Sequence, residues 1–133
     1  MNNIYCVFLA SVAVIGVLSE STSAFKIDST VSLINEHMIS MAVSEKSKIE
    51  AYKKNDISLL ALDHDYLSSI IDKTIVKNLA NIDYNIYYYY YDSVSLNSCS
   101  IGQFECNSVQ IKMDFHHHGK TYERIVRYEP VKI

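Results

Sequence analysis

The chain has 133 residues, a formal net charge of −3 at pH 7, three glycines, one proline and no tryptophan. This length fits one domain together with a targeting or anchoring segment. The slight acidic excess excludes the strongly basic surface by which proteins bind nucleic acid or anionic lipid, so we expect no nucleic-acid partner. Hydrophobic residues make up 49% of the chain, which is enough for a packed core.

The chain begins with an apolar segment, because Ile4 to Leu18 contains no charged residue. A membrane-spanning helix needs about 20 apolar residues, whereas the core of a signal peptide needs about 7–15. The small residues Thr22-Ser23-Ala24 follow and resemble a cleavage site, which would leave Phe25 at the mature N-terminus. One interpretation is therefore a signal peptide over residues 1–24, although no Lys or Arg precedes the apolar run.

The same segment also fits a membrane anchor that is retained. Apolar character extends from Ile4 to Phe25, with Glu20 near one end. A carboxylate near the interface is tolerated, whereas one at the bilayer centre costs about 2.5–3.5 kcal/mol. Both interpretations place residues 25–133 outside the cytoplasm as one domain. The membrane is thus the first expected partner, through the N-terminal helix.

Two of the three cysteines lie in the part of the chain that is expected to be exported. Cys6 belongs to the apolar run, whereas Cys99 and Cys106 are separated by six residues near the C-terminus. In an oxidising compartment such a pair forms one disulfide. A redox-active pair normally has two intervening residues, and a zinc site would need two further ligands at fixed spacing. We therefore predict a structural disulfide.

The first half of the chain has helical periodicity. Apolar residues recur at steps of three and four from Ile27 to Tyr52, which predicts an amphipathic helix that ends near Lys54. Traced backwards, the stripe meets the N-terminal apolar run, so one long helix would join the two. A second helix is predicted over Ser58 to Asn81, with Asp56 or Ser58 as its cap.

After this second helix the period changes to that of strands. Tyr84 to Tyr91 is rich in aromatic residues, and Val109 to His116 alternates strictly between apolar and polar residues. Gly119 supplies a turn before a last strand over Thr121 to Tyr128. The predicted fold is α+β: an N-terminal apolar helix that continues into an amphipathic helix, a second helix, and a three-stranded antiparallel meander with one disulfide. The segment Asp92 to Asn107 is expected to be a loop.

Five consecutive tyrosines occupy positions 87–91. Alternate residues of a strand point to opposite faces of the sheet, so about half of these rings would pack on the helices. Tyr87, Tyr89 and Tyr91 would then share the opposite face, where an exposed aromatic patch is a candidate interface for a protein or a sugar. Ordinary packing on both faces of the strand is the alternative interpretation.

Two further motifs invite a chemical interpretation and support none. The run His116-His117-His118 cannot converge on one metal ion if its side chains alternate along a strand. Asp63-His64-Asp65 lies on a predicted helix, where sequence neighbours do not face each other. No serine or cysteine nucleophile in a strained turn lies near this motif in sequence. The sequence therefore predicts a non-enzymatic protein without a metal or another cofactor.

The order of elements resembles that of bacterial pilin-like proteins. The resemblance rests on Ile4–Leu18, on Met38–Glu45 as part of the helix, and on Asp83–Ile86 followed by Cys99, Cys106 and Val109–Lys112. The family is that of the small pseudopilins of tight-adherence (Flp-type, TadE-like) pilus systems in Gram-positive bacteria. It implies a membrane-anchored, non-enzymatic subunit of a surface filament or of its assembly machinery, whose partners are copies of itself or other pilus subunits. The alternative is a secreted binding protein, such as an effector or an inhibitor, that presents the tyrosine strand.

Overall fold

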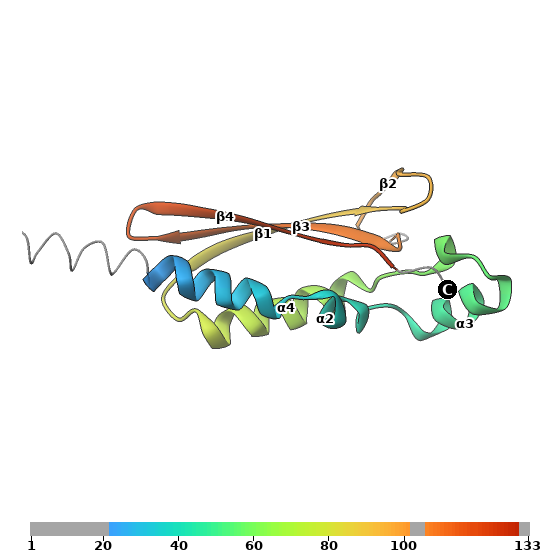
Figure 1. Ribbon diagram of the computed structural model, residues 1–133, viewed down its shortest axis with the longest axis horizontal. Helices are drawn as coiled ribbons and strands as arrows, with labels where there is room; N and C mark the ends of the chain where they lie inside the picture. Colours follow the sequence, from blue (N-terminus) through green and yellow to red (C-terminus); the bar gives the residue numbers. More distant parts are fainter. Residues whose placement is uncertain (1–21, 102–105, 131–133) are drawn as a thin grey trace, which may run out of the picture.

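The computed structural model describes residues 22–101 and 106–130. These residues form two layers, a four-stranded antiparallel sheet and a set of helices on one of its faces (Figure 1). The predicted α+β class is therefore confirmed. The predicted number of strands was wrong, because a short fourth strand joins the sheet.

The predicted long helix is broken into separate helices within the described part of the chain. A helix covers residues 22–33, α2 covers Glu36–Ser40 and α3 covers Glu45–Lys54. Asn35 caps α2 by accepting a hydrogen bond from the backbone N–H of Met38 at 2.9 Å. Ser44 caps α3 in the same way, with the N–H of Ser47 as donor. Each cap satisfies a backbone donor that a continuous helix would have paired internally.

The second predicted helix begins later than the sequence suggested. Asp56 caps only a 3-10 helix, η1, over Ile57–Leu59. The long helix α4 covers His64–Asn78, with Asp63 as its N-cap. The end of α3 agrees with the prediction, because Asn55 adopts the left-handed conformation that terminates helices.

The sheet consists of β1 (Asp83–Tyr91), β2 (Ser98–Cys99), β3 (Ser108–His117) and β4 (Lys120–Tyr128), in the order β2-β1-β3-β4. β2 lies in the predicted loop and pairs with the end of β1. A two-residue turn joins β3 to β4. Both of its residues have positive φ, 51° at His118 and 74° at Gly119, which is the turn geometry that suits tight hairpins.

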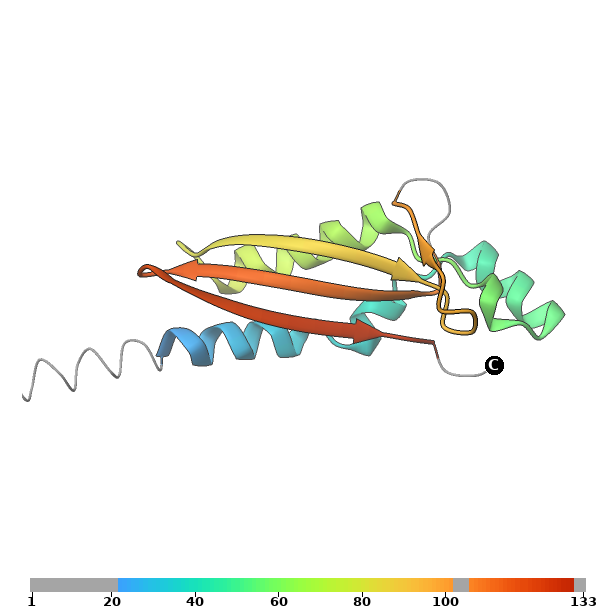
Figure 2. The same cartoon turned by 90° about the horizontal axis from the view of Figure 1, so that it is seen from above.

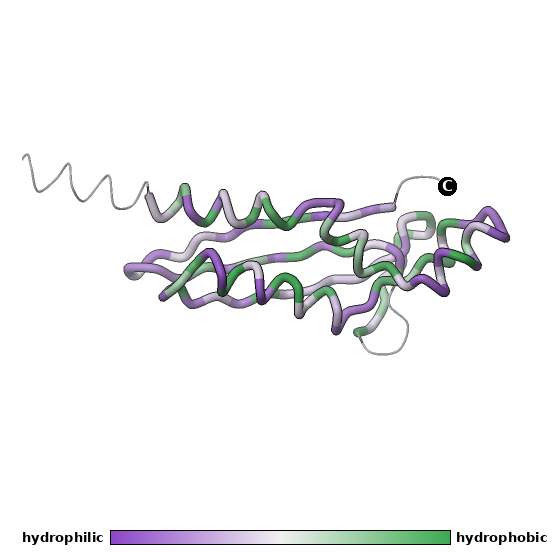
Figure 3. Tube along the Cα trace, turned by 90° about the horizontal axis from the view of Figure 1, so that it is seen from below, coloured by the Kyte–Doolittle hydropathy of each residue, from purple (hydrophilic) through white to green (hydrophobic). Residues whose placement is uncertain are grey.

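Two helices lie side by side beneath the sheet, whereas α3 lies beyond its end (Figure 1). The helix over residues 22–33 runs along β4, and α4 runs along β1 (Figure 2). Two contacts between side chains agree with this arrangement. The guanidinium of Arg124 on β4 pairs with Asp28, and the hydroxyl of Tyr84 on β1 donates to Asp72 at 3.3 Å. Figure 3 shows the two helices from below, with their hydrophobic segments distributed along them.

The hydrophobic core fills the space between the two layers. Each long helix contributes residues spaced three or four apart, and β3 contributes alternate residues, as the sequence periods predict. The fully buried core side chains include Ile27, Ile39, Leu67, Ile71, Ile75, Val109, Ile111, Met113 and Phe115. The sheet thus buries one face and leaves the other uncovered by described residues, as antiparallel sheets often do.

The predicted signal peptide or anchor, residues 1–24, lies outside the described residues except for Thr22 to Ala24. Among the helices of residues 22–101 and 106–130, none combines the length and the apolar character that a bilayer crossing needs.

Candidate protein-binding surfaces

The uncovered face of the sheet carries the tyrosines that the sequence singled out. Tyr87 and Tyr89 point away from the helices and are 44% and 55% exposed. Their neighbours in the run, Tyr88 and Tyr90, point into the interior. The tyrosine run therefore divides between the two faces, with part of it in the packing and part of it available to a partner.

Cationic side chains border the exposed rings. Lys112 lies opposite Tyr87 on β3, and its ammonium is 5.8 Å from the centre of that ring. Next in the same row, Ile125 of β4 is 53% exposed. Cation–π contacts of this kind are worth about 0.5–1 kcal/mol at exposed sites. The row therefore offers aromatic, cationic and aliphatic groups together.

The neighbouring charged groups make one hydrogen bond and one ion pair within the sheet. Arg127 donates to the side-chain oxygen of Gln110 at 2.8 Å, in the row that also contains Tyr89. Lys112 lies 3.8 Å from a carboxylate oxygen of Glu123. Exposed ion pairs contribute little to stability, so these charges remain available to an approaching partner.

Tyr91 differs from the other two residues of the predicted interface. Its hydroxyl donates to a carboxylate oxygen of Glu129 at 2.6 Å, and the side chain is partly buried. Burial, together with the hydrogen bond to Glu129 and the charge of that residue, raises the pKa of the Tyr91 phenol to about 12. Tyr91 is therefore tied to the C-terminal end of β4, whereas Tyr87 and Tyr89 are more open.

The inward tyrosines serve the packing of β1 on α4. The hydroxyl of Tyr90 lies 2.7 Å from Nδ1 of His64, and the His64 ring meets Tyr88 and Tyr90 edge-on. The hydroxyl of Tyr88 is buried and has no hydrogen-bond partner among the described residues. Burial raises the pKa of Tyr88 well above its usual value, because the phenolate form would lose its hydration.

The motif Asp63-His64-Asp65 is divided among structural contacts. Asp63 caps α4 by accepting from the backbone N–H of Tyr66 at 3.1 Å. His64 contacts the tyrosines of β1, and the backbone carbonyl of Asp65 accepts from Ser68. The three residues thus occupy the first turn of α4, and each has a different neighbour.

His116 and His117 point to opposite faces of the sheet, as the alternation of a strand requires, whereas the rings of His117 and His118 lie against each other with centroids 3.8 Å apart. His116 lies on the uncovered face, near Asn85 and Thr121. His117 lies on the helix side, where its Nδ1 is 3.0 Å from the hydroxyl of Ser23. His118 occupies the turn. Among residues 22–101 and 106–130, no group of three His, Cys, Asp or Glu side chains is arranged to hold a metal ion.

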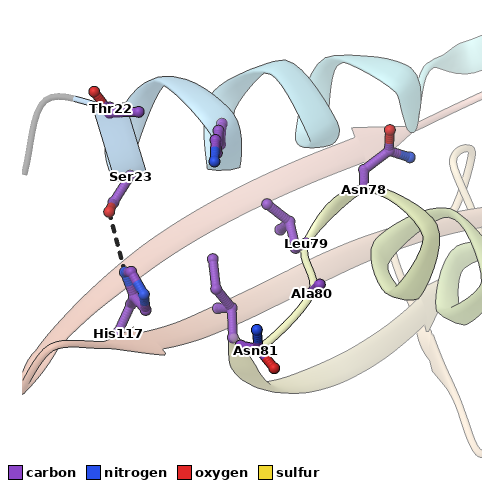
Figure 4. A pocket seen from close by; sticks show the side chains of 9 residues that line it. Thr22, Ser23, Asn78, Leu79, Ala80, Asn81 and His117 are labelled. Atoms are coloured by element: carbon purple, nitrogen blue, oxygen red, sulfur yellow. Dashed lines mark hydrogen bonds between the residues drawn. The ribbon is translucent and has the colours of Figure 1, made fainter. Parts of the chain in front are cut away.

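The contact between Ser23 and His117 lies at the side of a pocket of about 500 Å³ (Figure 4). The pocket is formed by the start of the described helix, the segment after α4 and the end of β3. It is lined by Thr22, Ser23, Lys26, Asn78, Leu79, Ala80, Asn81, Ile82 and His117. Ser23 belongs to the predicted cleavage site, yet its side chain is buried in this contact. Cleavage after Ala24 would remove a residue that packs on the sheet.

A second surface lies on the outer side of the helix over residues 22–33. Phe25 and Leu33 are 72% and 47% exposed, and with Ser29 they form a stripe at helical spacing. This outer stripe borders a groove of about 320 Å³, which is lined by Phe25, Lys26, Ser29, Thr30, Leu33 and Asn78. The sequence period predicted one apolar stripe on this helix. The second stripe was not predicted, although the spacing of eight residues between Phe25 and Leu33 is a signal for it.

The predicted disulfide joins Cys99 to Cys106, with their Cα atoms 5.9 Å apart. Beside it lies a polar residue that no sequence pattern singled out. Asn107 is buried, and its amide group donates to the carbonyl of Ile57 at 3.0 Å and to the hydroxyl of Ser93 at 3.1 Å. Its side-chain oxygen accepts from the N–H of Ser93 and the hydroxyl of Ser108. Asn107 therefore connects η1, the turn after β1 and the start of β3.

Comparisons of the chain with models of protein families, with curated proteins and with solved structures found no match. The geometry of the surfaces described above is therefore the basis for assigning a function.

Proposed function

We propose that the chain is a non-enzymatic, membrane-anchored, pilin-like subunit of a surface filament or of its assembly machinery. The observation that carries this proposal is the outer stripe of Phe25, Ser29 and Leu33. The helix over residues 22–33 already buries Ile27 against the sheet. A helix that also exposes two large apolar side chains, Phe25 and Leu33, on its outer side is suited to contact another helix there.

The position of this helix in the sequence supports a role in the membrane-proximal part of an assembly. It follows the apolar run Ile4–Leu18, and no proline or glycine lies between Leu18 and Leu33. The contact between Ser23 and His117 favours retention of the N-terminal segment, because cleavage after Ala24 would leave the pocket beside His117 without the serine. In this proposal, neighbouring subunits pack laterally through the outer stripe while the N-terminal segment stays in the membrane.

The test compares two double variants of the full chain in the membranes of the cells that express it. Phe25→Ser with Leu33→Ser removes the outer stripe. Ile49→Ser with Tyr52→Ser removes exposed apolar groups of α3 and is the matched control. We expect chemical cross-linking to give a ladder of multimers for the wild type and the control, and a monomer or a single dimer for the stripe variant, with all three in the membrane fraction. An unchanged ladder for the stripe variant would contradict the lateral contact.

A second candidate function, that of a secreted binding protein, is favoured by the uncovered sheet face. Tyr87 and Tyr89 beside Lys112 and Arg127 have the mixed aromatic and cationic character of residues that dominate binding energies at protein interfaces. N-terminal sequencing and intact mass of the native protein separate the two functions. The binding protein would be favoured, and the anchored subunit refuted, by a soluble chain in the medium that begins at Phe25. Its mass would be lower by the two hydrogens lost when the Cys99–Cys106 bond forms.

A further inference from the structure

The sheet ends in a long strand that pairs on one side only among the described residues. β4 pairs with β3 over its whole length, and the strand order β2-β1-β3-β4 places it at the edge. The helix over residues 22–33 lies in the helix layer, below the plane of the sheet (Figure 1). The outer backbone groups of such an edge strand can pair with another strand that approaches in the plane of the sheet.

Side chains alternate in character along this edge. Glu123, Ile125 and Arg127 lie on the uncovered face of the sheet, two residues apart. If two copies of β4 pair in antiparallel fashion about a two-fold axis perpendicular to the sheet, residues of the same face lie opposite each other. The symmetry then restricts the register, because an axis that passes through a residue makes that residue face its own counterpart.

One register is complementary in both charge and apolar character. With Ile125 on the two-fold axis, Ile125 faces Ile125 of the second copy, and Glu123 faces Arg127 of the second copy on both sides of the axis. Opposite charges in directly opposed positions stabilise a strand pair, whereas like charges destabilise it.

The neighbouring registers place like charges together. An axis at Glu123 or at Arg124 would oppose identical charges at the centre of the interface. An axis at Val126 would oppose Glu123 to Glu129 of the second copy. The charges that discourage general pairing at an exposed edge therefore select one register for self-association.

We propose that two copies of the chain associate through β4, in the register centred on Ile125, and so join their sheets into one continuous antiparallel sheet. The uncovered faces of both sheets then lie on the same side, and each helix layer lies on the other. This contact goes beyond the proposed function, because it uses neither the outer stripe nor the N-terminal segment. It assigns a second copy of the chain as the partner of β4.

Cysteine cross-linking tests the register. The variants are made in the full chain in a non-ionic detergent, with Cys6→Ser to remove the cysteine that does not belong to the Cys99–Cys106 disulfide. Opposed residues of a strand pair have Cβ atoms about 4.5–5.5 Å apart, near the range for a disulfide. Ile125→Cys is therefore expected to give a covalent dimer under mild oxidation. Thr121→Cys, on the same face of the same strand, is the matched control, because its counterpart would lie roughly 26 Å away at about 3.3 Å per residue.

Charge reversal tests the partner. Glu123→Arg places like charges opposite each other at both ends of the interface, and we expect the dissociation constant of the dimer to rise about tenfold or more. Glu123→Arg together with Arg127→Glu restores complementarity and is expected to restore the dimer. Because Glu123 also pairs with Lys112 in its own chain, Lys112→Gln is the control for the loss of that pair. Sedimentation over a range of protein concentrations measures the dissociation constant.

Three outcomes would overturn the proposal: a wild-type chain that remains monomeric over the concentration range, equal cross-linking of Ile125→Cys and Thr121→Cys, or a double reversal that fails to restore the dimer while circular dichroism shows an intact fold. The Phe25→Ser, Leu33→Ser variant separates this result from the proposed function. It is expected to keep the β4 dimer while losing the ladder of multimers.

Discussion

Replacing Asn107 with alanine is expected to destabilise the fold strongly, because this one side chain joins three segments of the chain. It is 1% exposed and takes part in four hydrogen bonds that reach Ile57, Ser93 and Ser108. Alanine would leave the partly buried N–H of Ser93 without a partner among the described residues, at about 1–3 kcal/mol. It would also remove one of the two hydrogen bonds that the Ile57 carbonyl accepts, the other coming from the N–H of Leu60, and the bonds to the hydroxyls of Ser93 and Ser108, at about 0.5–1.5 kcal/mol each. Ser93 and Ser108 can recover part of this loss by turning their hydroxyls, so we expect a total of about 3 kcal/mol.

The assay is urea unfolding of the full chain in a non-ionic detergent, followed by circular dichroism with the disulfide intact. Asn78→Ala is the matched control. Its side chain is exposed and donates to the carbonyl of Thr74 on the same helix, so this variant should lie within about 0.5 kcal/mol of the wild type. Unfolding of Asn107→Ala and Asn78→Ala at the same urea concentration would refute the expectation, because buried hydrogen bonds would then not determine how the segments around β2 are joined.

Further predictions concern the tyrosine strand and the disulfide. Tyr88→Phe should leave the free energy of unfolding unchanged or raise it by up to about 1 kcal/mol, because it removes a buried hydroxyl that has no partner in the described part of the chain. Tyr90→Phe should lower the free energy of unfolding by about 1–2 kcal/mol, because it removes the hydrogen bond to His64 on α4. Urea unfolding measures both changes. The phenol of Tyr91 should ionise near pH 12. The measurement is the ultraviolet absorbance of the wild type against pH, from which the curve of Tyr91→Phe is subtracted. A difference curve with its midpoint near pH 10 would contradict the burial of Tyr91 beside a carboxylate. Because the pKa of this tyrosine is raised in the folded state, its contribution to stability is complete below pH 10 and is lost as the pH rises from 10 towards 12. Replacing Cys99 and Cys106 together with serine should lower the free energy of unfolding by about 2–3 kcal/mol, as urea unfolding will measure. An unchanged free energy of unfolding would contradict a structural role for this bond.

The fold class and the strands could be predicted because their signals are periodic. Val109 to His116 alternates strictly, and the structure buries its apolar members while it places its polar members on the uncovered face. The same alternation correctly assigned Tyr87 and Tyr89 to that face. The disulfide followed from cysteine spacing and the expected compartment. These signals are local in sequence, so no knowledge of tertiary contacts was needed.

The breaks in the first half of the chain were harder to predict. The stripe of apolar residues continues through Asn35 and Ser44, so its period alone favours one helix. Both residues nevertheless act as N-caps. Asn and Ser are favoured N-cap residues, so they indicated helix starts at these positions, but the prediction of one helix followed the apolar period instead. Ile49 and Tyr52 belonged to the predicted stripe but are exposed, because α3 turns away and buries Ala51 instead.

Two other features depend on contacts between distant segments. β2 is two residues long, and Ser98 and Cys99 have no strand pattern of their own. They pair with β1 because the turn after Tyr91 returns the chain, with the carboxylate of Asp92 accepting from two backbone N–H groups of that turn. The role of Asn107 depends on η1, fifty residues earlier in the chain. No local pattern in the sequence indicates either contact.

The two contacts that we propose differ in symmetry, and this difference bears on what the chain can build. Pairing of β4 with β4 is isologous, so it closes after two copies and cannot by itself form a filament. The outer stripe of the helix over residues 22–33 borders a groove on another side of the molecule, and packing there can be heterologous, with a different surface of the next subunit as partner. A chain with one closed contact and one open contact can extend through pairs of subunits. Glu123→Arg should then halve the size of the smallest cross-linked species but leave a ladder of multimers, which would show that the β4 dimer is the building unit. Removal of the outer stripe should leave only dimers, which would show that the helix contact extends the assembly.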